Sequence, residues 1–133
     1  MIKLLLVGRG RVGMDPAEQR AYMKDSHGAA VVRLIAEDPG IAPSRYVQNH
    51  VTASYAAGGA EPDARDFATQ IWFDDPAHMQ AALTTPRYVD DLQPDEANFV
   101  DRPSVTMLPL DPTVVVEPAG GAAKVLVLLA SDV

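Results

Sequence analysis

The sequence predicts an α+β fold, in which a four-stranded antiparallel sheet carries its helices on one face. Its length of 133 residues is the usual size of one domain. Apolar runs of strand length alternate with segments of helical periodicity, in the order β-α-β-β-α-β. The helical segments begin at Asp-Pro or Thr-Pro pairs, which are typical helix starts.

Composition excludes several classes of function. The formal net charge of −7 argues against nucleic acid or a membrane surface as partner, because both attract clusters of Lys and Arg. The absence of cysteine excludes thiol catalysis, disulfides and cysteine metal sites, and it suits a cytoplasmic location. No apolar run reaches about 18 residues, so no membrane-spanning helix is expected.

The first strand is expected over residues 2–7, an apolar run that ends at Gly8. The stretch GRGRVG that follows fits the G-x-G-x-x-G spacing of a dinucleotide-binding loop. We reject that interpretation, because Asp15 and Pro16 intervene before the helix and no second strand with a terminal acid follows some twenty residues on. The glycines are interpreted instead as a flexible basic turn.

The helix expected over residues 15–37 is the element around which the chain is organised. Asp15 can cap its first free N–H groups, and Pro16 occupies the first helical position. His27 falls on the apolar stripe of this helix, four residues from an apolar neighbour on either side. An ionisable side chain is therefore expected to point at the layer that the helix covers. It is either a core histidine bonded to one carbonyl or water, or a functional residue.

Two further strands are expected over residues 45–54 and 67–73, because apolar and polar side chains alternate there. In the first of these strands, one side is mostly apolar and the other is polar and aromatic. The polar and aromatic side is either a solvated sheet face or the lining of a cavity.

The second half of the chain completes the fold. An Asp-Pro pair at residues 75–76 begins the next helix, and a Thr-Pro pair at 85–86 begins a short one. Pro94 is expected to begin a polar link to the last strand, over residues 105–110. This is the ferredoxin-like order of elements, which leaves one sheet face without helices. A homodimer through facing sheets would cover that face.

The last residues are expected to form a β extension, over residues 112–133, beyond a main domain of residues 1–111. Two runs, 114–116 and 124–130, are too apolar for a disordered tail. We expect them to pair with a sheet edge of the same chain or of the dimer partner.

The chain resembles the EthD domain family, within the dimeric α+β barrel superfamily, over roughly residues 2–110. The resemblance rests on KLLLVGRG with Gly13, the helix that reaches His27, RYVQNHV, IWFDDPAHMQAAL and DEANFVDRPSV. It implies a ferredoxin-like protomer, a two-fold dimer with facing sheets, and a loose link to oxidative degradation. The chain departs from the family at Gln19 and Met23, where an aromatic residue is common, and at Ala29, where proline is common.

Relatives in that superfamily include polyketide cyclases, decarboxylases, lactone isomerases and cofactor-free monooxygenases, so the resemblance does not fix the chemistry. A candidate site follows from His27. If Val47 and Val51 mark the helix-facing side, Asn49 lies beside His27 and His50 faces the dimer interior. Histidine titrates near neutral pH and an amide can hold a developing enolate. These properties predict His27 as a catalytic base and Asn49 as the catalytic group that stabilises oxyanion charge.

Other side chains are expected to bind the substrate. They are His50 and Gln70, the aromatic walls Tyr22, Tyr46 and Trp72, and the pair Asp95 and Phe99, which would close one end. No metal is expected, because no two of the three histidines are four residues apart. No haem or other cofactor is expected either.

Three classes of function remain open. The first is a cofactor-free acid–base enzyme of the cyclase, isomerase, decarboxylase or monooxygenase type, acting on an aromatic or polyketide-like substrate. The second is a non-catalytic binding or accessory protein for an oxidative degradation pathway. The third is a structural dimer whose pocket is filled by its own side chains. A cavity at His27 would favour the first two classes, and a sealed core would favour the third.

Overall fold

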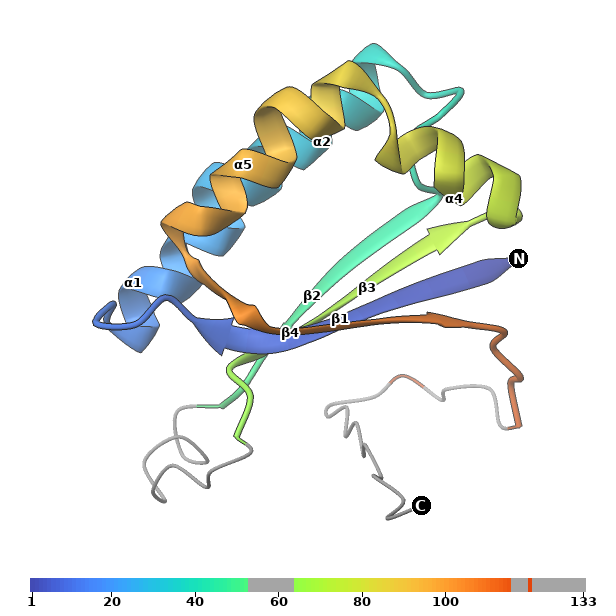
Figure 1. Cartoon of the computed structure of the whole chain (residues 1–133). Coiled ribbons are helices and arrows are strands. Elements are labelled where there is room, and N and C mark those ends of the chain that lie inside the picture. The colour runs from blue at the N-terminus through green and yellow to red at the C-terminus, as the bar shows by residue number, and fades with distance from the viewer. Residues whose placement is uncertain (53–63, 116–119, 121–133) are drawn as a thin grey trace.

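The computed structural model describes residues 1–52, 64–115 and 120. Within these residues, one antiparallel sheet has the strand order β2-β3-β1-β4, with all helices on one of its faces (Figure 1). The strands are β1 (Ile2–Gly10), β2 (Arg45–His50), β3 (Phe67–Phe73) and β4 (Val100–Leu110). The predicted α+β, ferredoxin-like fold is confirmed.

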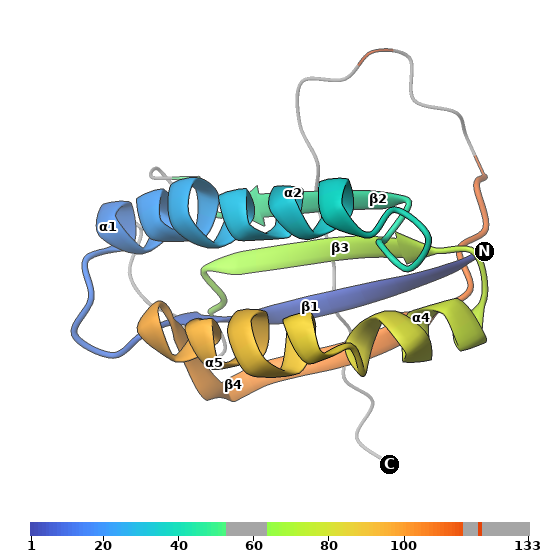
Figure 2. The same ribbon diagram turned by 90° about the horizontal axis from the view of Figure 1, so that it is seen from above.

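The helices form two rows over the sheet (Figure 2). The first row lies over β2 and β3, and it consists of α1 (Pro16–Ala21), the π-helix η1 (Tyr22–His27) and α2 (Gly28–Glu37). The second row lies over β1 and β4. It consists of α4 (Pro76–Leu83), the π-helix η2 (Arg87–Leu92), α5 (Gln93–Asp95) and the 3₁₀ turn η3 (Glu96–Asn98).

Both rows begin at the predicted caps. The Asp15 carboxylate accepts hydrogen bonds from two backbone N–H groups, at 2.8 Å and 3.3 Å. The Asp75 carboxylate accepts the N–H of His78 at 2.8 Å. The prediction that Pro94 begins a polar link is wrong, because Pro94 lies inside α5 and helical turns continue to Asn98. Proline followed by two acids is a favourable first helical turn, which explains the difference.

The first strand is longer than predicted and includes two of the glycines. A Cβ atom at Gly8 would lie 2.9 Å from Phe67 Cζ and 3.0 Å from Val105 Cγ2, so glycine lets these side chains pack over the strand. The turn comes after Gly10, and within it Gly13 has a φ of 81°, which favours glycine.

Strand register places alternate residues on opposite sheet faces. Facing the helices, Leu4 and Phe73 pack against Ala82 of α4, while Phe67 packs with Met23 and Phe99. The opposite face carries a second apolar cluster, formed by Leu5, Val7 and Ala68 with Leu108 and Leu110. The sheet therefore has apolar groups on both sides.

The predicted extension over residues 112–133 lies almost entirely outside the described residues, so the division at residue 111 stays a prediction. The second strand ends at His50, earlier than expected, and residues 53 and 54 of the predicted strand also lie outside the described part. In the described ranges, no helix has the length and apolar character needed to cross a membrane.

Candidate functional site

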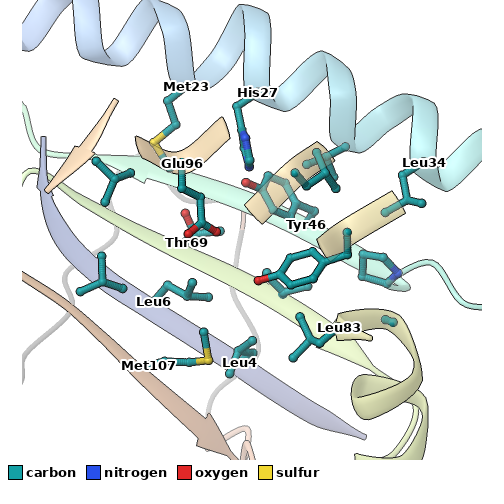
Figure 3. A pocket seen from close by; sticks show the side chains of 18 of the residues that line it. Leu4, Leu6, Met23, His27, Leu34, Tyr46, Thr69, Leu83, Glu96 and Met107 are labelled. Carbon is teal, nitrogen blue, oxygen red and sulfur yellow. The ribbon is translucent and has the colours of Figure 1, made fainter. Parts of the chain in front are cut away.

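A cavity of about 90 Å³ lies between the helices and the sheet (Figure 3). Its lining is mostly apolar, and the polar side chains in it are His27, Tyr46, Thr69, Tyr88 and Glu96. Sites for drug-sized ligands typically measure about 300–1,000 Å³, so this cavity suits a small molecule. An occupant with more than one ring would require side chains to move.

His27 reaches the cavity from the π-helix η1, and π segments occur frequently at functional sites. In this segment the Met23 carbonyl accepts the backbone N–H of Gly28. It also accepts Gln48 Nε2 from β2 at 2.8 Å, so the sheet holds the widened turn. A Cβ at Gly28 would lie 3.2 Å from the Met23 oxygen and 3.4 Å from Gln48 Nε2, and glycine leaves room for both bonds.

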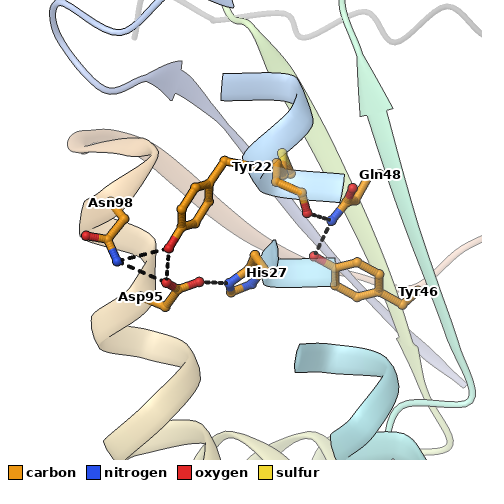
Figure 4. A network of polar contacts seen from close by, with 7 residues as sticks. Tyr22, His27, Tyr46, Gln48, Asp95 and Asn98 are labelled. Carbon is orange, nitrogen blue, oxygen red and sulfur yellow. Dashed lines mark hydrogen bonds and ion pairs between the residues drawn. The ribbon is translucent and has the colours of Figure 1, made fainter. Parts of the chain in front are cut away.

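The His27 imidazole is paired with a carboxylate from the other helical row (Figure 4). His27 Nδ1 lies 2.9 Å from Asp95 Oδ2. The other oxygen, Asp95 Oδ1, accepts the Tyr22 hydroxyl at 2.7 Å and Asn98 Nδ2 at 3.0 Å. Burial alone would raise the pKa of Asp95, but hydrogen bonds from Tyr22, Asn98 and His27 together lower it.

This pairing fixes the tautomer of a neutral His27. An ionised carboxylate can only accept hydrogen bonds, so the imidazole proton lies on Nδ1. Nε2, the ring nitrogen that does not contact Asp95, then keeps its lone pair, and the His27 side chain lines the cavity. The arrangement can therefore take a proton from a molecule in the cavity.

Phe99 packs against the rings of two members of this network, His27 and Tyr22. Its side chain is only 2% exposed and lines the cavity. The ring centroid lies 4.9 Å from that of His27 and 5.5 Å from that of Tyr22, with which it stacks. The hydrogen bond to Asp95 raises the pKa of Tyr22, which therefore stays a donor at neutral pH.

Three cavity groups were missed in the sequence: Thr69, Tyr88 and Glu96. Burial raises the pKa of Tyr88 to about 12, and burial also raises the pKa values of Tyr46 and Glu96. The helix-start pattern at Pro94 was the available signal for Glu96. A helical turn there turns adjacent side chains in different directions, so Asp95 meets His27 while Glu96 enters the cavity.

The predicted site residues divide between the two sheet faces. His27, Tyr46 and Phe99 line the cavity, and Tyr22 and Asp95 lie directly behind the imidazole. The prediction that Asn49 lies beside His27 is wrong. Asn49 pairs with Ala68 on the face away from the helices, and its Nδ2 donates to the Ala68 carbonyl at 2.7 Å.

Trp72 and Gln70 lie on that same opposite face, so they are not walls of this cavity. The Trp72 ring lies between two cations, with Lys3 Nζ at 5.6 Å and Arg45 Cζ at 4.8 Å from its centroid. Cation–π contacts of this kind stabilise an aromatic side chain outside a core.

His50 lies on the helix-facing side, opposite Phe67 in the register, so the prediction that it faces a dimer interior is wrong. It does not line the cavity. Burial, and then the charge of Arg20, lower the pKa of His50. In the described part of the chain, no group of three or more His, Asp or Glu side chains is placed to hold a metal ion.

The sequence profile of the EthD domain matches residues 11–103, which is more than half of the chain. The chain belongs to the EthD domain family. A search of curated proteins found no match.

Solved structures similar to this EthD domain share its fold at low sequence identity. An EthD family protein from Bacillus halodurans has a TM-score of 0.60 and 17% identity, over 85% of this chain and 99% of that chain. A dimeric ferredoxin-like protein of unknown function from Bacteroides fragilis has a TM-score of 0.58 and 14% identity, over 83% and 94%. An antibiotic biosynthesis monooxygenase has a TM-score of 0.51 and 14% identity, over 86% and 100%.

Proposed function

We propose that this EthD domain is a cofactor-free acid–base enzyme that removes a proton from a small, apolar substrate, with His27 as the base. The observation that carries the proposal is the His27–Asp95 pair, 2.9 Å apart at the wall of an apolar cavity. Cyclases, isomerases, decarboxylases and cofactor-free monooxygenases all handle carbanion or enolate character, so this step is common to the candidate reactions. Positioned acids and bases contribute about 10²–10⁴-fold to rates.

Asp95 supports this role in two ways. It orients the imidazole so that the lone pair of His27 Nε2 faces the cavity, and its charge stabilises the imidazolium formed when the proton is taken. The apolar lining strengthens that electrostatic interaction, because few groups in the cavity screen it.

The hydrogen-bond network also connects the buried base to solvent. Asp95 and Asn98 line an outer groove of about 550 Å³ between the two helical rows. The Asp95 side chain is 24% exposed, whereas that of His27 is 9% exposed. Protons can therefore be exchanged with water behind the imidazole, while the cavity side stays apolar.

The cavity volume limits the substrate. A single ring or a short carbonyl compound suits a cavity of about 90 Å³ better than an extended polyketide does. The methionines Met23 and Met107 in the lining are adaptable side chains, whose movement would admit a larger aromatic molecule. The similarity to a protein described as a monooxygenase supports oxidative chemistry on such a ring as one form of the reaction.

The alternative is a non-catalytic binding or accessory protein of an oxidative degradation pathway. The observation that favours it is the scarcity of polar groups in the lining, because an apolar cavity alone is sufficient for binding. The third class, a dimer with its pocket filled by its own side chains, is disfavoured by the cavity at His27.

The test of the proposed function is proton exchange in a small ketone. Butanone is incubated in D₂O with the protein, and loss of its α-proton signal is followed by NMR. We expect exchange faster than with free imidazole at the same concentration. Butanone binding without acceleration would contradict the enzyme and support the accessory role, and absence of both would leave the structural dimer.

We further propose that the chain forms a homodimer through its sheet faces, in the cytoplasm. The apolar cluster around Leu5 and Leu108, on the face away from the helices, supports the sheet-face contact. The similar fold of a protein described as dimeric supports the assembly. Light scattering is expected to give the mass of two chains, and the mass of one chain would contradict this proposal.

A further inference from the structure

We propose that Glu96 is the general acid of this site and that the substrate is an uncharged, enolisable ketone or aldehyde. In this assignment Glu96 protonates the carbonyl oxygen while His27 takes the proton from the adjacent carbon. The inference rests on the proposed function of His27, which it extends by a second catalytic group and a substrate class.

The first support is the placement of two successive carboxyl groups. Asp95 contacts the Nδ1 side of the His27 ring, and the next residue, Glu96, extends into the cavity (Figure 3). Glu96 and His27 come from different helical rows and line the same cavity. A carbonyl compound in that cavity would therefore meet a base from one row and a carboxylic acid from the other.

The second support is the contrast between the hydrogen bonding of these two carboxyls. Asp95 accepts hydrogen bonds from Tyr22, Asn98 and His27, and an ionised carboxylate suits these donors. No side chain in the described ranges donates a hydrogen bond to the Glu96 carboxyl. Glu96 is partly buried, and partial burial without donors shifts a carboxyl group toward its neutral, protonated form. In many active sites the environments of two carboxyls move their pKa values apart. One carboxyl then serves as the protonated acid while the other stays charged.

Groups from several packed elements determine the charge balance around Glu96. Burial raises the pKa of Glu96, the negative charge of Asp95 raises it further, and Arg102 from β4 lowers it. Tyr46 from β2 and Tyr88 from η2 lie near enough for a charged Glu96 to raise their own pKa values. Both tyrosines stay neutral, so neither places a phenolate charge beside Glu96.

The proposed step conserves atoms and electrons without an oxidant. His27 Nε2 takes the α-proton, and the C–H electron pair becomes the C=C bond of an enol. The carbonyl π pair takes the proton of Glu96, which becomes a carboxylate. Reversal returns one proton from His27 to carbon and the other from the enol oxygen to Glu96. If His27 exchanges the abstracted proton with solvent before the reversal, return to the same carbon gives hydrogen exchange. Return of a proton to a different carbon gives isomerisation.

The substrate class follows from the lining. A carboxylate substrate would bring an unpaired negative charge into a mostly apolar cavity, which is unfavourable. A neutral carbonyl compound needs only one donor for its oxygen, and a protonated Glu96 supplies it. Thr69, Tyr46 and Tyr88 are further hydroxyl groups that line the same space.

The decisive experiment compares Glu96→Gln with His27→Gln in the butanone exchange assay. We expect His27→Gln to return the rate to that of buffer and Glu96→Gln to lower it about 10²-fold. The wild-type rate should fall as pH rises through the pKa of Glu96, and Glu96→Gln should lack that fall. Glu18→Gln, at an exposed position of α1, is the matched control and should keep the wild-type rate.

The outcomes separate the two proposals. If His27→Gln loses exchange and Glu96→Gln keeps the wild-type rate and pH profile, the role of Glu96 is wrong while the function of His27 stands. If the wild-type protein does not accelerate exchange, both proposals fail.

Two measurements on Glu96 do not depend on turnover. In ¹³C NMR its carboxyl should titrate above the ordinary value of 4.5. When the pKa of a carboxyl is higher in the folded protein than in the unfolded chain, its ionisation lowers stability at pH values above the unfolded-state pKa. Well below that pKa the carboxyl is protonated in both states and has no such effect. Glu96→Gln should therefore have a higher Tm than the wild type at pH 7, and this difference should vanish below about pH 4. A carboxyl that titrates at or below 4.5 would overturn the assignment.

Discussion

Replacing Asp95 with asparagine is expected to slow butanone proton exchange by about 10²–10⁴-fold, close to the loss expected from removing the His27 imidazole. Two donors, the Tyr22 hydroxyl and Asn98 Nδ2, converge on Asp95 Oδ1. In the variant, the amide oxygen takes that position, so the amide NH₂ faces His27 Nδ1 and donates to it. The imidazole proton then moves to Nε2, where the ring can no longer accept a proton from the cavity.

The variant Asp95→Asn tests whether Asp95 acts by orienting His27, because the variant keeps the imidazole and changes only its tautomer. In ¹⁵N NMR, the wild-type His27 should carry its proton on Nδ1 and the variant should carry it on Nε2. Asp90→Asn, an exposed position on the same helical row, is the control and should change neither the rate nor the tautomer. A variant with the changed tautomer and an unchanged rate would show that His27 is not the base.

Asp95→Asn is also expected to change how the free energy of unfolding depends on pH. The lowered pKa of Asp95 means that its ionised form stabilises the fold, fully above about pH 5 and progressively less as pH falls through its folded-state pKa. Asp95→Asn removes this contribution at neutral pH. The wild type and the variant should therefore converge in unfolding free energy below about pH 3.

Replacing Phe99 with alanine is expected to lower the free energy of unfolding by about 3–5 kcal/mol. The side chain is 2% exposed, packs with Met23 and Phe67, and contacts the rings of Tyr22 and His27. The loss includes burial of the ring and the void left beside the His27 network. Urea unfolding followed by circular dichroism measures it.

The control for Phe99→Ala is Val32→Ala, at a position of α2 that is 65% exposed. Its unfolding free energy should stay within about 0.5 kcal/mol of the wild type, apart from the small effect of helix propensity. A Phe99→Ala variant that loses less than about 1 kcal/mol would show that Phe99 is not part of a tightly packed core.

The local elements were predictable because short-range physics determines them. Asp15 and Asp75 cap their helices as the sequence indicates, and Pro follows each of them. Period-two alternation located the strands, and the helical stripe placed His27 toward the sheet. These signals depend only on residues that are close together in the sequence, so they can be read without knowledge of the tertiary structure. The π-helical turn at Met23 was not visible, because Gln48 from β2 helps to hold it.

The sequence by itself determined the order of elements, the helix starts and the presence of a histidine on the covered face of a helix. Only the tertiary structure decided what surrounds that histidine. Asp95 is 68 residues away in sequence, and it reaches His27 because two helical rows pack together. Asn49 faces away because the pairing of β2 with β3 turns Gln48 to the helices instead. A shift of one residue in register exchanges the two faces of a strand, and alternation alone does not choose between them.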